Sequence, residues 1–369
     1  MRHRLNASTI ALAIMTVVLV PRTSAAACTP TGFIRDAINL TAAAINPTTV
    51  TSPLDATGCD IGVYYDHNVT GGVATLTSVE VRNARYFGVV ANGDAGSFAV
   101  HINNNLIHHI GEVPFNGAQH GVGIYIRAFF GFNITGEVNG NLVYAYQKGG
   151  IVATGRGTKI AQLNSNKVIG LGHVTFIAQN GIQISYGAMP APSQVLSNTV
   201  TGNSYIGFPG DGSASGGILV VGGPYYGLCP DGDPCPYVKT ALIGVNVTLT
   251  AVGVNTVLNN DVGVFVSNVA GDGNAAATPT NNLVVASLAG SDVAYNTSYM
   301  TGISDYGNGD FILGNYIMVG GGYGPSCVSE IDTVGSINPT LAANTPATCT
   351  ASPAAAASAV KLKASPEQP

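Results

Sequence analysis

From Gly58 onward the chain alternates short apolar runs, rich in β-branched residues, with Gly and Asn. Two elements recur in this part of the sequence. The first is an Asn followed by an apolar pair or near-pair, and it occurs at residues 105–107, 141–143, 166–168, 198–200 and 255–257. The second is a Gly followed by apolar, variable and apolar positions, and it begins at Gly88, Gly121, Gly150, Gly181, Gly217 and Gly263. Both patterns predict short β-strands.

The spacing of the repeated glycines indicates a repeat architecture. The intervals are 33, 29, 31, 36 and 46 residues, and the longest contains a segment around Cys229 and Cys235 that we interpret as an insertion. Repeats of 20–50 residues are typical of stacked units. A β-propeller requires about 40–45 residues per blade and antiparallel hairpins, whereas these intervals are mostly shorter. We therefore expect an all-β parallel β-helix over residues 58–322.

The recurring Asn supports this expectation on physical grounds. Neighbouring coils of a β-helix stack about 4.8 Å apart, so equivalent side chains lie above one another. An inward Asn at the same turn of each coil can then bond to the next coil in an amide ladder.

These repeats resemble the right-handed parallel β-helix superfamily that includes pectin and pectate lyases. The resemblance implies the fold but no single activity, because the fold hosts lyases, hydrolases, epimerases, adhesins and scaffolds. Polygalacturonases of this fold carry an Asp-Asp motif, which is absent here, and Gly172-His173-Val174 departs from their Gly-His-Gly motif. Pectate lyases bind calcium with clustered acids, and Glu112 and Glu137 alone do not form such a cluster. We therefore expect neither a metal nor a cofactor.

The N-terminus has the three parts of a secretory signal peptide. Arg2 and Arg4 precede the apolar run 10–20, and small residues at 24–27 offer a cleavage site. We expect residues 1–27 to be removed and the protein to be secreted or displayed on a cell surface. Residues 28–57 should form the N-terminal cap, in which apolar residues at helical spacing over 31–45 predict a short helix.

Composition narrows the choice of partners. Without its first 27 residues, which hold three Arg and no acidic residue, the chain has 11 Lys and Arg against 19 Asp and Glu, a formal charge of −8. Nucleic acids require a basic face, which this chain lacks. The run 10–20 is too short to span a bilayer, and Gly, Asn or Ser interrupts every later candidate span.

Six cysteines in a secreted chain suggest disulfides. Neighbours in sequence would pair Cys28 with Cys59, Cys229 with Cys235 and Cys327 with Cys349, although other pairings stay open. Residues 323–350 would form a disulfide-tied C-terminal segment, and the Ala- and Pro-rich residues 351–369 a disordered tail.

Three Gln-x-Gly tripeptides suggest a site: Gln119-His120-Gly121, Gln147-Lys148-Gly149 and Gln179-Asn180-Gly181. If they stack as strands, the three Gln form one row and His120, Lys148 and Asn180 form another on the opposite side, because strand residues alternate. Lys is rarely buried unpaired, so the second row should face solvent. If the segment is a turn, both rows could be exposed. Amides suit sugar hydroxyls, since they donate and accept hydrogen bonds. The alternative is an amide ladder that only tightens the stack.

Twelve of the 21 Lys, Arg and His residues fall within residues 82–184. A polysaccharide lyase requires a base and a cation that neutralises the sugar carboxylate. Lys148 could be the base, with His120 or Arg127 as its partner and Glu112 nearby, although solvated turn residues would give the same pattern. His108 and His109 should point to opposite faces of a strand and should not share an ion.

Two functions therefore stay open. The protein binds, and in one version cleaves, a polysaccharide or surface glycan on one face of residues 82–184. Alternatively, it is a structural or adhesive solenoid without an active site. The oligomeric state does not follow from the sequence.

Overall fold

The computed structural model describes residues 27–189, 193–206, 213–221, 248–267, 284–289, 292–295, 301–306, 311–319, 329–332, 339–346 and 361–362. These residues form almost exclusively β-strands, with one short 3-10 helix, η1 (Thr70–Gly72). The expected all-β class is confirmed. No helix among the described residues is long and apolar enough to cross a membrane.

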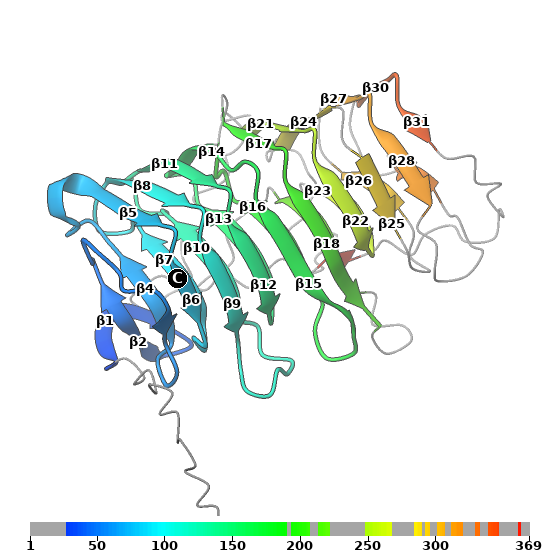
Figure 1. The fold of residues 1–369 in the computed structure, drawn as a ribbon. Coiled ribbons are helices and arrows are strands. Elements are labelled where there is room, and N and C mark those ends of the chain that lie inside the picture. The colour runs from blue at the N-terminus through cyan, green and yellow to red at the C-terminus, as the bar shows by residue number, and fades with distance from the viewer. Residues whose placement is uncertain are drawn as a thin grey trace, which may run out of the picture.

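The strands form three long sheets that run side by side along the molecule (Figure 1). Sheet A contains β1 (Thr29–Arg35), β2 (Ile38–Ile45), β4 (Ile61–Tyr65), β7 (Phe87–Asn92), β10 (Val122–Arg127), β13 (Gly149–Thr154), β16 (Asn180–Ser185), β20 (Gly216–Val221), β23 (Val262–Ser267), β26 (Thr301–Tyr306) and β29 (Ser329–Asp332). Sheet B contains β3 (Leu54–Asp55), β6 (Glu80–Arg82), β9 (Leu106–Ile110), β12 (Leu142–Tyr146), β15 (Lys167–Val174), β18 (Thr199–Tyr205), β22 (Thr256–Asn260), β25 (Asp292–Tyr295), β28 (Tyr316–Val319) and β31 (Thr345–Pro346). Sheet C contains β5 (Val73–Thr77), β8 (Phe98–Asn103), β11 (Ile134–Asn139), β14 (Thr158–Gln162), β17 (Gln194–Leu196), β21 (Thr248–Gly253), β24 (Val284–Ala289), β27 (Phe311–Leu313) and β30 (Thr340–Ala342).

The chain visits the sheets in the order A, C, B and back to A, and we call each such circuit a coil. Beyond the hairpin β1–β2, each strand pairs in parallel with the equivalent strand of the next coil. Ile124 therefore stacks on Ile151, which stacks on Ile182, and these columns form the buried core. The arrangement is consistent with a parallel β-helix.

The repeated glycine lies where sheet B leads into sheet A. A Cβ atom added at Gly123 would lie 2.4 Å from Val143 Cγ1 and 2.6 Å from the carbonyl oxygen of Gly150. Only glycine fits this close approach between two sheets. The repeat glycine of this coil is thus Gly123, which stacks against Gly150, rather than Gly121.

The predicted Asn ladder is confirmed. Both the backbone N–H and the side-chain amide of Asn105 donate to Asn141 Oδ1, each at 3.0 Å. Asn141 repeats this pattern with Asn166, and the ladder continues through Asn198 to Asn255. All five side chains are buried, so their amides join successive coils within the protein.

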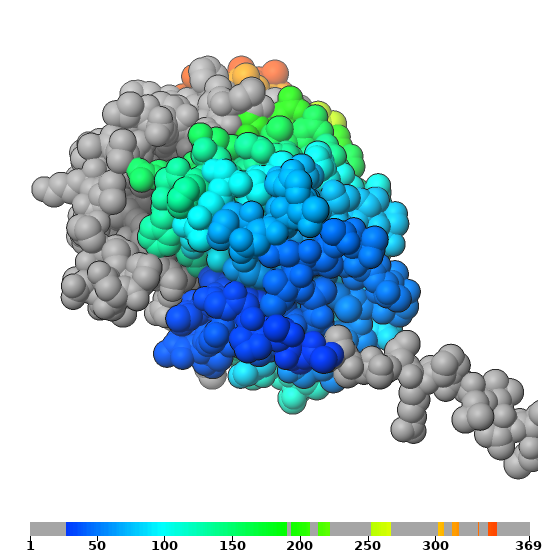
Figure 2. All heavy atoms as spheres, turned by 90° about the vertical axis from the view of Figure 1, so that its left-hand side faces the viewer, coloured from blue at the N-terminus to red at the C-terminus, as the bar shows by residue number. Residues whose placement is uncertain are grey.

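The predicted N-terminal helix is wrong, because residues 29–45 form the antiparallel hairpin β1–β2. Asp36 and Ala37 both have positive φ, as a two-residue hairpin turn requires. Strand β2 pairs with β4 and thereby supplies hydrogen-bond partners to the first edge of sheet A, which a helix would leave open. The hairpin and first coil form the surface at the N-terminal end of the stack (Figure 2).

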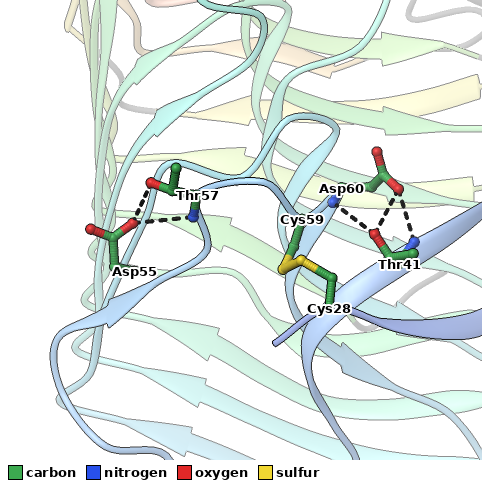
Figure 3. Close-up of a disulfide and its surroundings, with 6 residues drawn as sticks. All are labelled: Cys28, Thr41, Asp55, Thr57, Cys59 and Asp60. Atoms are coloured by element: carbon green, nitrogen blue, oxygen red, sulfur yellow. Dashed lines mark hydrogen bonds between the residues drawn. A yellow bond between two sulfur atoms is a disulfide. The ribbon is translucent and has the colours of Figure 1, made fainter. Parts of the chain in front are cut away.

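The disulfide Cys28–Cys59 is confirmed and fastens this hairpin to the first coil (Figure 3). Thr41 of β2 donates both its backbone N–H and its hydroxyl to Asp60 Oδ2, each at 2.9 Å. Cys229, Cys235, Cys327 and Cys349 lie outside the described residues, as does the expected signal peptide up to residue 26. Of the predicted tail, the structure describes Lys361–Leu362 (β32), which pairs in parallel with β19 (Ser213–Ala214).

Candidate functional site

The three Gln-x-Gly tripeptides are not in register, contrary to the prediction. Val122 pairs with Gly149, which pairs with Asn180, so each tripeptide is displaced by one position from its neighbour. His120 is consequently level with Gln147, and Lys148 with Gln179. The connections from sheet B to sheet A differ in length from coil to coil, which removes the regular spacing that the motif implied.

Gln147 and Gln179 are fully buried and hold loops against the stack. The side-chain N–H of Gln147 donates to Ala118 O at 2.7 Å, and its Oε1 accepts from the backbone N–H of Asn116 at 3.0 Å. Gln179 Oε1 likewise accepts from Leu171 N at 2.9 Å. These two amides are occupied by backbone groups, so they are not available to a sugar.

Lys148 and Asn180 are also buried, which corrects the prediction that their row faces solvent. The ammonium group of Lys148 donates to Ala178 O at 2.9 Å. Strand alternation does not apply here, because this segment includes the corner between two sheets, where the chain changes direction. Gln119 is partly buried and donates to Gly117 O at 3.2 Å within its own loop.

Arg127 belongs to a different part of the molecule. It ends β10, whereas His120 precedes that strand, and seven residues of extended chain span roughly 20 Å. The Arg127 guanidinium is buried, contacts Asp94 Oδ2 at 2.6 Å and lies over the rings of Phe33 and Phe129. It therefore cannot act beside His120 or Lys148.

The structure does bring His120 and Glu112 together. His120 Nε2 lies 2.8 Å from Glu112 Oε1, and Arg85 Nε donates to the same oxygen at 2.8 Å. The His120 ring stacks on Tyr86 with centroids 3.9 Å apart. Neither Arg85 nor Tyr86 was predicted as a site residue, because both lie one coil earlier, more than 25 residues before Glu112 and His120 in the sequence. We call these four residues the corner cluster.

Burial and hydrogen bonding together shift the pKa values of His120 and Glu112 in the corner cluster. Burial lowers the pKa of His120, although the hydrogen bond with Glu112 opposes the shift. Burial acts to raise the pKa of Glu112, but its bonds with Arg85 and His120 outweigh burial and lower it. At neutral pH the imidazole is therefore uncharged, with its proton on Nε2 beside the carboxylate and a basic lone pair on Nδ1.

The outer face of sheet C carries a second cluster of polar residues, which was not predicted from the sequence. The strand register places five polar residues in one row across successive coils, namely Thr75, His101, Glu137, Gln162 and Gln194. Two residues further along the strands, Thr77, Asn103 and Asn139 form a second row. We call these two rows the sheet C face.

Glu137 is the centre of the sheet C face. Its Oε1 accepts from Asn103 Nδ2 at 2.7 Å and contacts His101 Nδ1 at 3.2 Å, and its Oε2 accepts from Asn139 Nδ2 at 3.2 Å. The bonds with Asn103 and then His101 lower the pKa of Glu137. The side chains of His101 and Glu137 are 45% and 34% exposed, so this network is open to a ligand.

An aromatic loop borders this face where β11 begins. Phe130 and Phe132 are 42% and 41% exposed, which is unusual for phenylalanine. The backbone of Gly157 bonds to Ala128 and Ile134, so the exposed Arg156 of the next coil lies beside the loop. Three Phe within residues 129–132, outside the repeats, are the sequence signal that could have identified this edge.

A third arrangement, of His173, Ser204 and Asp261, differs from the triad of a hydrolase. His173 Nδ1 and Asp261 Oδ1 both contact Ser204 Oγ, at 2.8 and 2.7 Å. In a hydrolase triad the carboxylate instead orients the histidine, and Ser204 is also buried. Within the part of the chain that the structure describes, no group of three or more His, Cys, Asp or Glu is placed to hold a metal ion.

Comparison with known proteins adds no relative. No protein-family model matches the chain, and no curated protein or solved structure does so either.

Proposed function

We propose that this protein is a secreted or cell-surface right-handed parallel β-helix, similar to the pectin lyase fold, which binds a polysaccharide on its sheet C face. The observation that carries the proposal is the accessible, in-register network around Glu137, which joins β8 to β11 and reaches Gln162 of β14 through Asn139. Right-handedness follows from the strong preference of parallel strand connections. The disulfide Cys28–Cys59 supports an oxidising location outside the cytosol.

The chemistry of this face suits a sugar chain. Carboxylate, amide and imidazole groups accept from and donate to hydroxyls. Exposed aromatic rings such as Phe130 and Phe132 offer flat surfaces for the apolar faces of sugar rings. A six-residue strand extends about 20 Å, which matches roughly four sugar units laid along β11.

A glycan array probed with the mature protein is the first test. Binding should be found, and Phe130→Ala should weaken the strongest interaction by about tenfold, since losing one stacked ring costs about 1–2 kcal/mol. Lys167→Ala, an exposed change on sheet B, is the matched control and should bind like the wild type. If no glycan binds, or if both variants bind like the wild type, the proposal fails.

Polysaccharide cleavage is the second candidate, and the corner cluster favours it. His120 Nδ1 could remove a proton from a sugar while Glu112 orients the ring. The negative charge near the cluster argues against an acidic substrate, because Asp36 and Asp60 also lie near Arg85 and Tyr86. Ultraviolet absorbance of unsaturated products should be lost in His120→Ala if the cluster is catalytic. If no product forms with the wild type, the binding-only function stands.

A structural or adhesive role without a ligand site is the remaining alternative. It predicts that substitutions on the sheet C face change neither glycan binding nor stability.

A further inference from the structure

We propose that His108 and His109 together bind one divalent transition-metal ion through their Nδ1 atoms. The pair lies on the outer face of sheet B, away from the sheet C face. Consecutive residues of a regular strand point to opposite faces, which is why the sequence argued against a shared ion. The structure overturns that argument, because the two Nδ1 atoms face each other at 2.5 Å.

The backbone explains how both rings reach the same side. His109 has a φ of +55°, so the strand is not extended at this residue. The equivalent residue of other coils also has positive φ, as in Asn83, Ala145 and Asn259. The fold thus builds the same bend into many coils, and in this coil the bend joins two neighbouring histidines.

His108 is held in the form that binds metals. Its Nε2 lies 3.3 Å from Glu80 Oε1, and Arg82 Nη1 fixes that carboxylate at 2.9 Å. The ring is buried and stacks on Tyr144, with centroids 4.9 Å apart and planes inclined by 7°. A carboxylate on one ring nitrogen places the proton there and leaves the other nitrogen free to ligate, as in carboxylate–histidine–metal sites.

The ligand set determines the kind of ion and its affinity. Two nitrogens bound to one ion lie roughly 3 Å apart, since metal–nitrogen bonds are about 2.0 Å. A small rotation of the exposed His109 ring is enough to reach this separation. Imidazole selects Cu²⁺, Ni²⁺ and Zn²⁺, with Cu²⁺ the strongest. Two protein ligands leave the remaining positions to water, so binding should be reversible.

Titration calorimetry of the mature protein with Cu²⁺ alone tests the site. We expect one ion per chain, and His109→Ala should abolish this binding. His67→Ala, which removes another exposed histidine, is the matched control and should bind normally. Ala145 already occupies the equivalent bend, so His109→Ala is expected to fold.

Glu80→Gln provides an independent check, because it keeps both ligands but weakens the orientation of His108. It should reduce Cu²⁺ affinity about tenfold, as for other outer-shell changes. The proposal is overturned if the wild type binds no Cu²⁺ or if His109→Ala binds it with unchanged affinity and stoichiometry.

Discussion

The corner between sheets B and A and the outer face of sheet C contain the same kinds of side chain in different surroundings. At the corner, residues 111–121 and 175–179 connect the sheets, and backbone groups occupy Gln147 and Gln179. On sheet C the connections to sheet B are short, and Glu137 and Gln162 stay accessible. In this stacked fold the residue type alone therefore does not decide whether a polar side chain is accessible to a ligand. The length of the neighbouring connection decides it, because a long connection covers the side chain and a short one leaves it exposed.

The largest expected difference concerns two glutamines. Gln147→Ala should destabilise the protein by about 1–3 kcal/mol, because it removes a fully buried amide and the hydrogen bonds that hold the loop before β10. Gln162→Ala removes an exposed amide and should change stability by less than about 0.5 kcal/mol. Denaturant unfolding of both variants measures the difference. Equal losses of unfolding free energy would show that Gln147 at the corner contributes no more to stability than Gln162 on the sheet C face.

Two lysines, one buried at the corner and one exposed on sheet C, should differ by a smaller amount in their effect on stability. Lys148→Ala should cost about 1–2 kcal/mol, since it removes a buried side chain and its hydrogen bond to Ala178 O. Lys159, exposed on sheet C, is the matched control, and its replacement by Ala should be nearly neutral. Thermal unfolding at neutral pH gives both values. A neutral Lys148→Ala would restore the earlier expectation of a solvent-facing lysine.

The smallest effect is a pH dependence at the corner. Because burial lowers the pKa of His120 below its ordinary 6.5, the unfolded chain binds a proton more readily than the folded protein. The stability that this residue contributes is therefore present above pH 6.5 and is lost as the pH falls through the folded pKa. His120→Gln should lose less stability than the wild type between pH 7 and pH 5. An unchanged pH profile would contradict the burial of this imidazole.

The sequence predicted the features that recur from coil to coil, but not those that depart from the repeat. The Asn ladder and the parallel stacking follow from spacing, because stacked coils place equivalent residues together. The repeat glycine of one coil was assigned to Gly121 instead of Gly123. Both glycines fit the motif, and the packing of Gly123 against Val143 distinguishes them. The hairpin at 29–45 and the bend at His109 depend on backbone conformations that apolar spacing does not encode. Exposure of Glu137 depends on which connections are short, so its role could not be predicted from residue type.

Two carboxylates, Glu137 and Glu112, distinguish glycan binding on the sheet C face from binding at the corner cluster. Glu137→Gln and Glu112→Gln remove the same charge, one from the sheet C face and one from the corner cluster. Affinity for the strongest glycan of the array should fall about tenfold or more in Glu137→Gln, as expected for a lost charge-assisted hydrogen bond, and should be unchanged in Glu112→Gln. The reverse result, with affinity lost only in Glu112→Gln, would place the ligand at the corner cluster and exclude the sheet C face as the binding site.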